Sequence, residues 1–465
     1  MENDSSVFKI LVVRADRLGD VILSTPVLGA LRAHYPQAEL HFLMRESVAP
    51  LLRGLTHLDH VLIFEPQGRH RGFKGFFRLV RELRAENYKI AVLLQSQFKL
   101  AAAVFFARIP RRVGPLSKVY SFLFYNRGVR QKRSHVEMHE ADYNLQLLRA
   151  LGIRVGHRRF LPQVQFSEVA REDARAWLQA WGWNGGRSLV LVHPGMGGSA
   201  LNWPESHYFE LIRALSREVG VQVVVTGGPA ETPLLERLRA RLLEHPDEEG
   251  SCPPLFTHLP FPVFKSTAEL NPSADPQTNR QRAQAEHQAT RLLSPSSGLF
   301  LEKGVDRLAA LMSFSSVVVA PSTGPLHLAA ALGKSVVTFF PPIRVQSAIR
   351  WGPYQSEFKA GSILVPEVYC GQDRHCRGPV CIYYPCMRSI SVSEALGEVQ
   401  SQLRRVPAVP TPGSTLPPQK APPELPLELP QEVREKELAG IAVGEVDTIH
   451  EATGDPFRRG SRDES

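Results

Sequence analysis

Cysteine is scarce in this chain, with five among 465 residues. The count is odd and Cys252 stands far from the other four, so we expect a reducing compartment rather than a disulfide framework. No run of about 18 uncharged apolar residues occurs, and we therefore expect no membrane-spanning helix. The richest stretch, residues 90–109, is interrupted by Gln95, Gln97, Lys99 and Arg108. The first residues have neither a basic start nor a long apolar run, so no signal peptide is expected.

A dinucleotide-binding signature is also missing. No GxGxxG opens the first expected helix, and the sequence RLGD at residues 17–20 does not replace it. This absence argues against a dinucleotide-dependent oxidoreductase, which is the first alternative class. Nothing resembles a nucleic-acid-binding module either.

The composition is that of a soluble globular protein, with 43% hydrophobic and 22% charged residues. The length allows two or three domains with cores of their own. The net charge of +9 suits an acidic partner. A nucleotide, a phosphorylated glycolipid, an anionic membrane and a nucleic acid all qualify on charge alone.

Strands and helices alternate along both halves of the chain. Expected strands lie at residues 9–14, 40–43, 61–64, 90–94, 189–193, 221–226, 317–319 and 336–340. Expected helices lie at residues 73–85, 136–151, 205–219, 233–243, 306–314 and 326–332. A further helical pattern at residues 21–34 either bends at Pro26 or begins there with Thr25 as its cap. This alternation predicts an α/β protein of two Rossmann-like domains that face a central cleft.

The sequence predicts two domains, an insertion in the second domain and a C-terminal tail. We predict an N-terminal domain at residues 1–155, a connection at 156–187 and a second domain at 188–400. Residues 245–300, rich in Pro, Ser and Gln, are expected to be a poorly ordered insertion. Residues 407–430 hold nine prolines, so residues 401–465 are expected to be a disordered tail or linker.

The loop after the strand at residues 317–319 has features of an anion site. Ser322 and Thr323 offer hydroxyls, Gly324 permits close approach, and a helix follows at once. Free N–H groups and the helix dipole favour a phosphate there, and His327 can add a donor. The alternatives are an ordinary tight turn and a buried His327 bonded to backbone.

Two carboxylates and a run of small residues follow other strands. Asp20 is either a helix cap or a group facing the cleft, and Glu231 is either a cap or an acceptor for vicinal hydroxyls. Residues 197–200 form either a flexible turn or a loop whose N–H groups approach a diphosphate. Arg14 and Arg17 either hold phosphates or are solvated charges.

Four segments resemble glycosyltransferase family 9, the ADP-heptose:lipopolysaccharide heptosyltransferases. They are VVRADRLGDVILSTPVLGALRAHYP, HPGMGGSALNWPESHY, TGGPAE and PSTGPLHLAAALG. The resemblance covers about residues 8–244 and 304–400. It implies the GT-B fold and an inverting transfer from an ADP-sugar, ADP-heptose above all, in the C-terminal half to a glycolipid in the N-terminal half. It implies neither a metal nor a cofactor for the chemistry, and no nucleic acid as a partner.

The resemblance also implies roles for residues. Asp20 would be the catalytic base and Glu231 would bind the donor ribose. Other donor-binding residues would be Gly197, Gly198, Ser199, Asn202, Ser322, Thr323, Gly324 and His327, and acceptor-binding residues Arg14 and Arg17. Leu201 replaces a family lysine that reaches the donor phosphates, and Ser322 replaces a family aspartate. Another nucleotide-sugar donor, or a non-catalytic binding protein, therefore remains an alternative.

Basic stretches and a group of four cysteines lie outside the predicted catalytic motifs. Basic and aromatic residues mix at residues 69–78, and a second basic stretch lies at residues 127–133. Both indicate either a solvated face or contact with an anionic membrane or acceptor phosphates. We expect a cytoplasmic protein, with peripheral contact to the inner membrane. Cys370, Cys376, Cys381 and Cys386 lack CxxC spacing, so we expect packing or disulfides, with a four-thiolate metal site as the alternative.

Overall fold

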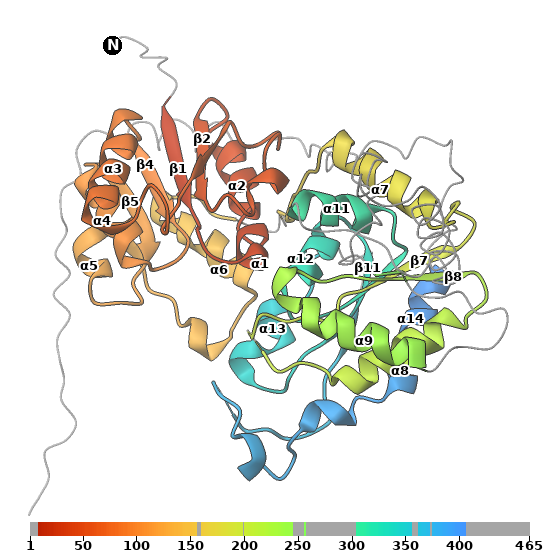
Figure 1. The fold of residues 1–465 in the computed structure, drawn as a ribbon. Helices are drawn as coiled ribbons and strands as arrows, with labels where there is room; N and C mark the ends of the chain where they lie inside the picture. Colours follow the sequence, from red (N-terminus) through yellow and green to blue (C-terminus); the bar gives the residue numbers. More distant parts are fainter. Residues whose placement is uncertain are drawn as a thin grey trace, which may run out of the picture. The chain divides into compact units, whose positions relative to one another are not determined.

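The computed structural model describes residues 8–155, 160–198, 200–244, 255–256, 304–355, 361–372 and 374–405. Within these residues the strands form two sheets, and each sheet belongs to one half of the chain (Figure 1). No helix of the described residues is long and apolar enough to cross a membrane.

The first sheet has the strand order β3-β2-β1-β4-β5-β6. All its neighbouring strands run parallel. The strands are β1 (Lys9–Val13), β2 (Glu39–Met44), β3 (His60–Ile63), β4 (Ile90–Leu93), β5 (Arg111–Pro115) and β6 (Arg127–Val129).

The second sheet has the order β12-β11-β10-β7-β8-β9, also parallel throughout. The strands are β7 (Ser188–Val192), β8 (Val221–Val225), β9 (Leu255–Phe256), β10 (Val317–Pro321), β11 (Ser335–Phe339) and β12 (Ser362–Leu364). Counted from its own first strand, it repeats the order of the first sheet. This is the Rossmann order, so the prediction of two Rossmann-like halves is confirmed.

Both faces of each sheet are covered, because successive side chains of a strand point to opposite faces. In β1, Ile10 and Val12 pack with α1 (Leu18–Ile22) and α2 (Pro26–His34). Leu11 and Val13 pack with α3 (Gly72–Ala85) and α4 (Phe98–Phe106) on the other face. These unbroken apolar strands follow from double burial.

The second sheet is covered in the same way. Leu189 and Leu191 of β7 share a core with α7 (Glu168–Ala180), α11 (Val305–Ser313) and α12 (Gly324–Ala331). Val190 and Val192 pack with α8 (Glu205–Ser216), α9 (Thr232–Glu244) and α14 (Val392–Arg405).

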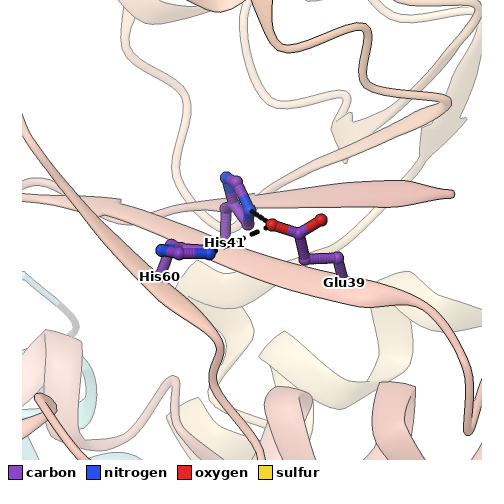
Figure 2. Close-up of side chains that lie close together, drawn as sticks. All are labelled: Glu39, His41 and His60. Atoms are coloured by element: carbon purple, nitrogen blue, oxygen red, sulfur yellow. Dashed lines mark hydrogen bonds and ion pairs between the residues drawn. The ribbon is translucent and has the colours of Figure 1, made fainter. Parts of the chain in front are cut away.

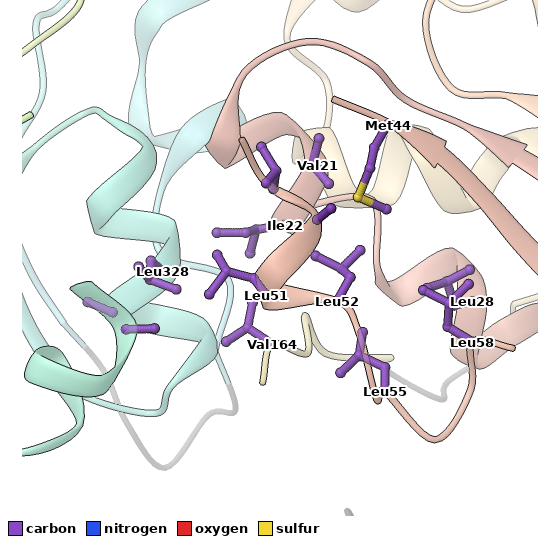
Figure 3. Close-up of a cluster of buried hydrophobic side chains, with 14 of the residues drawn as sticks. Val21, Ile22, Leu28, Met44, Leu51, Leu52, Leu55, Leu58, Val164 and Leu328 are labelled. Atoms are coloured by element: carbon purple, nitrogen blue, oxygen red, sulfur yellow. The ribbon is translucent and has the colours of Figure 1, made fainter. Parts of the chain in front are cut away.

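One apolar cluster includes residues of both halves. Figure 3 shows Val21 and Ile22 of α1 and Leu328 of α12 among its members. Burial of each such side chain contributes roughly 1.5–3 kcal/mol. The cluster therefore fixes α1 and α12, which carry two of the predicted site motifs.

Several predicted boundaries need correction. α1 ends at Ile22 and α2 begins at Pro26, so the second alternative for residues 21–34 is right about where the helix begins. Thr25 does not cap it, because its Oγ1 donates to the carbonyl of Ile22 at 2.8 Å. The helix expected at residues 136–151 is instead α6 (Glu140–Gln146) followed by a 3₁₀ turn, Leu147–Leu151.

The sequence patterns missed α4, β5 and β6, which are short or lie in a mixed apolar stretch. The predicted insertion and tail lie mostly outside the described residues. Two residues of that insertion form β9 at the edge of the second sheet, which corrects the expectation of disorder there. α14 also continues to Arg405, beyond the expected end of the domain.

Candidate functional site

The predicted site motifs follow β1, β7, β8 and β10. Each begins where its strand ends, at the carboxyl edge of a parallel sheet. β1 lies between β2 and β4, and β7 lies between β8 and β10, so both strands flank the point where the order reverses. Ligands of open α/β sheets bind at such switch points.

Arg14 and Asp20 form an ion pair at the end of β1. Arg14 is 3% exposed, and its Nε donates to Asp16 Oδ1 at 2.9 Å while Nη1 donates to the carbonyl of Leu94 at 3.1 Å. Arg14 thus holds Asp20 in place, and the structure does not present it as the acceptor ligand that we predicted. Its guanidinium is buried and already occupied.

Asp20 is not a helix cap. The N-cap position of α1 is Arg17, and Asp20 lies in the first turn with its carboxylate toward Arg14. Its side chain remains 17% exposed, so it stays accessible from the loop surface. Arg17 is exposed at the start of the helix.

A buried carboxylate lies behind this pair. Glu140 at the start of α6 is 1% exposed and contacts three arginines. Its Oε1 is 3.5 Å from Arg14 Nη1 and accepts a bond from Arg133, while its Oε2 is 2.9 Å from Nη2 of Arg350 in α13 (Ala348–Trp351). Burial opposes ionisation, but the three positive charges outweigh it and lower the pKa of Glu140.

Asp16 adds a third carboxylate to the same cluster. Burial, together with the charge of Asp20, raises the pKa of Asp16 to about 6, although Arg14 acts in the opposite direction. Asp16 therefore takes up a proton near neutral pH more readily than a free aspartate does.

Replacement of Asp16 tests this. A raised native pKa means that the folded state binds the proton more tightly between about pH 4 and pH 6, so ionisation of Asp16 lowers stability as pH rises through that window. The variant Asp16→Asn has no such group, so its free energy of unfolding should increase relative to that of the wild type by on the order of 2 kcal/mol between about pH 4 and pH 6. Above about pH 6 the difference between the two proteins should stay constant. Urea unfolding at half-unit pH steps measures it, and a constant difference across that window would contradict the raised pKa.

The loop of Asp20 touches the helix of the fourth motif. A Cβ atom at Gly19 would lie 2.6 Å from Cδ2 of His327, and one at Gly324 would lie 3.0 Å from Cβ of Leu18. Only glycine fits at these positions without displacement of its neighbours. Residues more than 300 positions apart in the sequence thus form one site.

His327 is buried with an unpaired ring nitrogen. It is 4% exposed, and its Nδ1 makes no hydrogen bond to the residues that the structure describes. Burial, helped by nearby His139, lowers the pKa of His327 to about 3, so the ring is neutral at physiological pH. The alternative of a histidine satisfied by backbone therefore does not describe Nδ1, which is buried without a partner among the described residues.

Thr323 takes the N-cap position of α12, but its side chain makes no capping hydrogen bond. Ser322 lies just past β10 and is buried. The first N–H groups of α12 are thus not capped by Thr323, as the start of an anion-binding helix requires.

Glu231 lies against the loop that follows β7. Its Oε2 accepts the N–H of Gly228 at 2.7 Å and is 3.5 Å from Nε2 of His193. A Cβ atom at Gly195 would lie 2.0 Å from Oε1 of Glu231, so glycine is required there. Oε2 thus acts as the cap that one alternative predicted, whereas Oε1 faces the glycine-rich loop.

The glycine-rich loop is open where a diphosphate would approach. A Cβ atom at Gly197 or Gly198 would meet nothing within 4 Å. Ser199 lies outside the described residues. Asn202 stabilises the loop, because its Nδ2 donates to the carbonyl of Pro194 at 2.8 Å and its Oδ1 accepts from the hydroxyl of Tyr208 at 3.0 Å. Its donor-binding role stays a prediction.

A separate cluster lies at the amino ends of the strands. Oε1 of Glu39 is 2.8 Å from Nε2 of His41 and 3.1 Å from Nε2 of His60 (Figure 2). Hydrogen bonds account for this arrangement, and Nζ of Lys9 lies 3.9 Å from the other oxygen of Glu39. The nearby cation disfavours a metal ion, and this edge is opposite to the site motifs.

Sequence reasoning missed Asp16, Glu140, Arg133 and Arg350. Asp16 could have been noticed as a second carboxylate in the loop after β1. Glu140 and Arg350 gave no signal, because charged residues near helix ends usually face solvent. The interpretation of residues 127–133 was also incomplete: Arg127–Val129 forms β6, and Arg133 binds Glu140.

Comparisons with known proteins agree with this geometry. The structure of E. coli ADP-heptose lps heptosyltransferase II matches with a TM-score of 0.60, at 22% identity over 86% of this chain and 99% of that chain. Fold and site loops together define the class of GT-B glycosyltransferases, as the sequence predicted. The sequence profile of glycosyltransferase family 9 (heptosyltransferase) matches residues 76–252 and 273–377, more than half of the chain. The chain therefore belongs to glycosyltransferase family 9, and it is a glycosyltransferase.

Individual relatives are more distant. A Haemophilus influenzae protein provisionally named a glycosyltransferase is 26% identical over 406 residues, which is 86% of this chain and 97% of that protein. Lipopolysaccharide heptosyltransferase 2 of Salmonella typhimurium is 31% identical over 225 residues, which is 47% of this chain and 63% of that protein.

Proposed function

We propose that this enzyme transfers a heptose, or a closely related sugar, from an ADP-sugar to a glycolipid acceptor of lipopolysaccharide core assembly, with inversion at the anomeric carbon. The observation that carries the proposal is the contact between the loop of Asp20 and the start of α12, through Gly19 and His327. It brings a fixed carboxylate next to an anion-binding helix end. The names of the Salmonella and E. coli relatives support the choice of donor and acceptor.

In this proposal Asp20 removes the proton from an acceptor hydroxyl. The hydroxyl oxygen then forms a bond to the anomeric carbon while the bond from that carbon to the diphosphate breaks, and ADP leaves with the electron pair. Positioned general bases of this kind typically contribute 10²–10⁴-fold to the rate. Arg14 orients the carboxylate, and Arg17 contacts the acceptor phosphates.

Backbone donors receive the negative charge of the leaving group. The N–H groups at Gly197, Gly198, Thr323 and Gly324 and the dipole of α12 stabilise the diphosphate, and His327, in the first turns of α12, supports the donor. These groups need no bound metal ion to act. Oε1 of Glu231 accepts from the ribose hydroxyls, since it faces the glycine-rich loop.

Calorimetric titration with ADP, UDP and NAD tests the donor site. Wild type should bind ADP in preference to UDP and NAD, and Glu231→Ala should bind it about 10- to 100-fold more weakly, because one charged hydrogen bond is worth about 1.5–3 kcal/mol. Glu231→Gln is the matched control for shape, and the exposed Glu46→Ala should leave the Kd unchanged.

The outcomes separate the alternatives. Preference for UDP would keep the fold and change the donor. No binding of any nucleotide diphosphate would overturn the enzyme's assignment to ADP-sugars. Binding of ADP without turnover would favour a non-catalytic binding protein.

An apolar face beside the first sheet supports peripheral membrane contact. Phe73 and Phe77 are 87% and 64% exposed on α3, one turn apart, with Lys74 and Arg78 between and beside them. Exposed aromatic side chains also lie on α4, at Phe98 and Phe106, and on α5 (Ser121–Phe124), at Phe122. The ring of Phe76 on α3 contacts that of Phe106. Apolar residues next to basic ones are typical of binding to anionic lipid surfaces.

Substitution of this face should weaken vesicle binding. We expect Phe73→Ser combined with Phe77→Ser to reduce sedimentation with vesicles containing phosphatidylglycerol about tenfold or more, because each buried side chain contributes roughly 1.5–3 kcal/mol. Val169→Ser, an exposed apolar position on α7, is the control. Equal binding by the double variant, or binding only to neutral vesicles, would contradict the assignment of this face.

A further inference from the structure

Four cysteines surround one cavity. Cys370, Cys376, Cys381 and Cys386 all line it, and all four are half-buried free thiols. The expectation of disulfides among them is therefore wrong. The cavity lies in the segment that connects β12 to α14.

This segment does not hold itself together by apolar burial. Tyr369, Val380 and Ile382 are 86%, 81% and 88% exposed. Met387 and Ile390, in the last part of the segment, belong to the core of the second sheet. The regular structure described in it is limited to two 3₁₀ turns, Gly378–Val380 and Cys386–Ser389. Long irregular segments with little core are usually stabilised by disulfides or a metal ion.

A backbone donor points at one of these sulfurs. The N–H of Gly378 donates to Sγ of Cys376 at 3.2 Å. Hydrogen bonds of this kind orient the first ligands of a metal site.

We propose that the four cysteines bind one thiophilic divalent ion, Zn²⁺ or Fe²⁺, in a tetrahedral four-thiolate site. Four thiols release their protons, and four metal–sulfur bonds form without any redox change. Sulfurs about 2.3 Å from one ion lie about 3.8 Å apart. Among the described residues, only Glu39, His41 and His60 have three ligand atoms within 4.8 Å of one another. The four sulfurs are therefore farther apart than a bound ion requires, and in the proposal the segment moves them closer together when the ion binds. Gly371 and Gly378, at positive φ beside two of the cysteines, provide the turns for this.

The site would fix the segment against the glycine-rich loop. Leu201 of that loop and Ile343 line the same cavity. The N–H of Leu201 also faces Oε1 of Gln346 at 3.4 Å, and the N–H of Arg344 donates to the carbonyl of Gln372 at 3.2 Å. The metal thus has a structural role, and its presence does not depend on which nucleotide sugar the enzyme uses.

Metal analysis of the full-length protein tests the proposal. We expect one equivalent of zinc or iron per chain after purification without chelator. The variants Cys376→Ser and Cys381→Ser should retain about a tenth of that metal content or less. Cys252→Ser and Glu39→Gln, outside the proposed site, should keep the full equivalent. Retention of the ion by both cysteine variants would overturn the site.

Two measurements on the wild type avoid the problem of variants that fail to fold. Replacement by Co²⁺ should give the visible bands of tetrahedral cobalt with sulfur-to-cobalt charge transfer. A strong chelator should make four additional thiols reactive toward a thiol reagent under native conditions. Absence of the cobalt–thiolate bands, or the same thiol count with and without chelator, would overturn the proposal.

Discussion

Asp20→Asn should reduce kcat by about 10²- to 10⁴-fold while the Kd for ADP changes less than about twofold. The amide has the shape of the carboxylate but cannot take the proton from the acceptor hydroxyl. The donor groups lie on other loops, so they are expected to remain intact. Turnover of an ADP-sugar with a glycolipid acceptor, next to calorimetry with ADP, measures both quantities.

The control for this variant is Asp173→Asn. Asp173 forms a surface ion pair with Arg307 at 2.8 Å, and its loss removes a negative charge far from the site motifs. Its kcat should equal that of the wild type. A kcat of Asp20→Asn within tenfold of the wild type would exclude Asp20 as the base, and Asp16, in the same cluster, would be examined next.

Glu140→Ala should lower the free energy of unfolding by about 3–5 kcal/mol, the largest stability effect that we expect. The truncation leaves Arg14, Arg133 and Arg350 facing one another in a buried place without their shared counter-charge. Urea unfolding at pH 7 measures the effect.

Glu46→Ala is the matched comparison. Glu46 pairs with Arg53 at 3.0 Å, but both side chains are more than half exposed. Its loss should change the free energy of unfolding by less than about 1 kcal/mol, because exposed ion pairs contribute little. Similar effects of the two variants would mean that the Glu140 network does not contribute as a buried network should.

Local patterns were sufficient to predict the fold. The apolar strand of residues 9–14 and the strand–loop–helix of residues 317–332 each carry their own signal, since burial on both faces requires unbroken apolar residues. Repetition of these units in two halves then implies two parallel sheets. The family motifs placed Asp20, Glu231 and His327 in the segments that directly follow β1, β8 and β10, and the structure has them there.

Partners distant in the sequence could not be predicted. Arg14 and Asn202 were expected to bind ligands, and the contacts that occupy them come from residues such as Glu140 and Tyr208, which no local pattern marks. The close approach of Gly19 to His327 likewise joins segments that the sequence separates by more than 300 residues. Tertiary packing decides which charged side chains are buried. The composition gives only how many charged residues the chain has.

The cluster of Arg14, Arg133 and Arg350 with Asp16, Asp20 and Glu140 has equal numbers of positive and negative groups. Loss of the charge at a buried member such as Glu140 or Arg14 leaves its partners without a counter-charge, which water cannot replace. Evolutionary change at these positions is therefore expected to be concerted: a lineage that loses Arg350 should also alter Glu140 or gain a new cation. The balance of charge thus links Arg350, in the second half of the chain, to Asp20 in the first through Glu140 and Arg14.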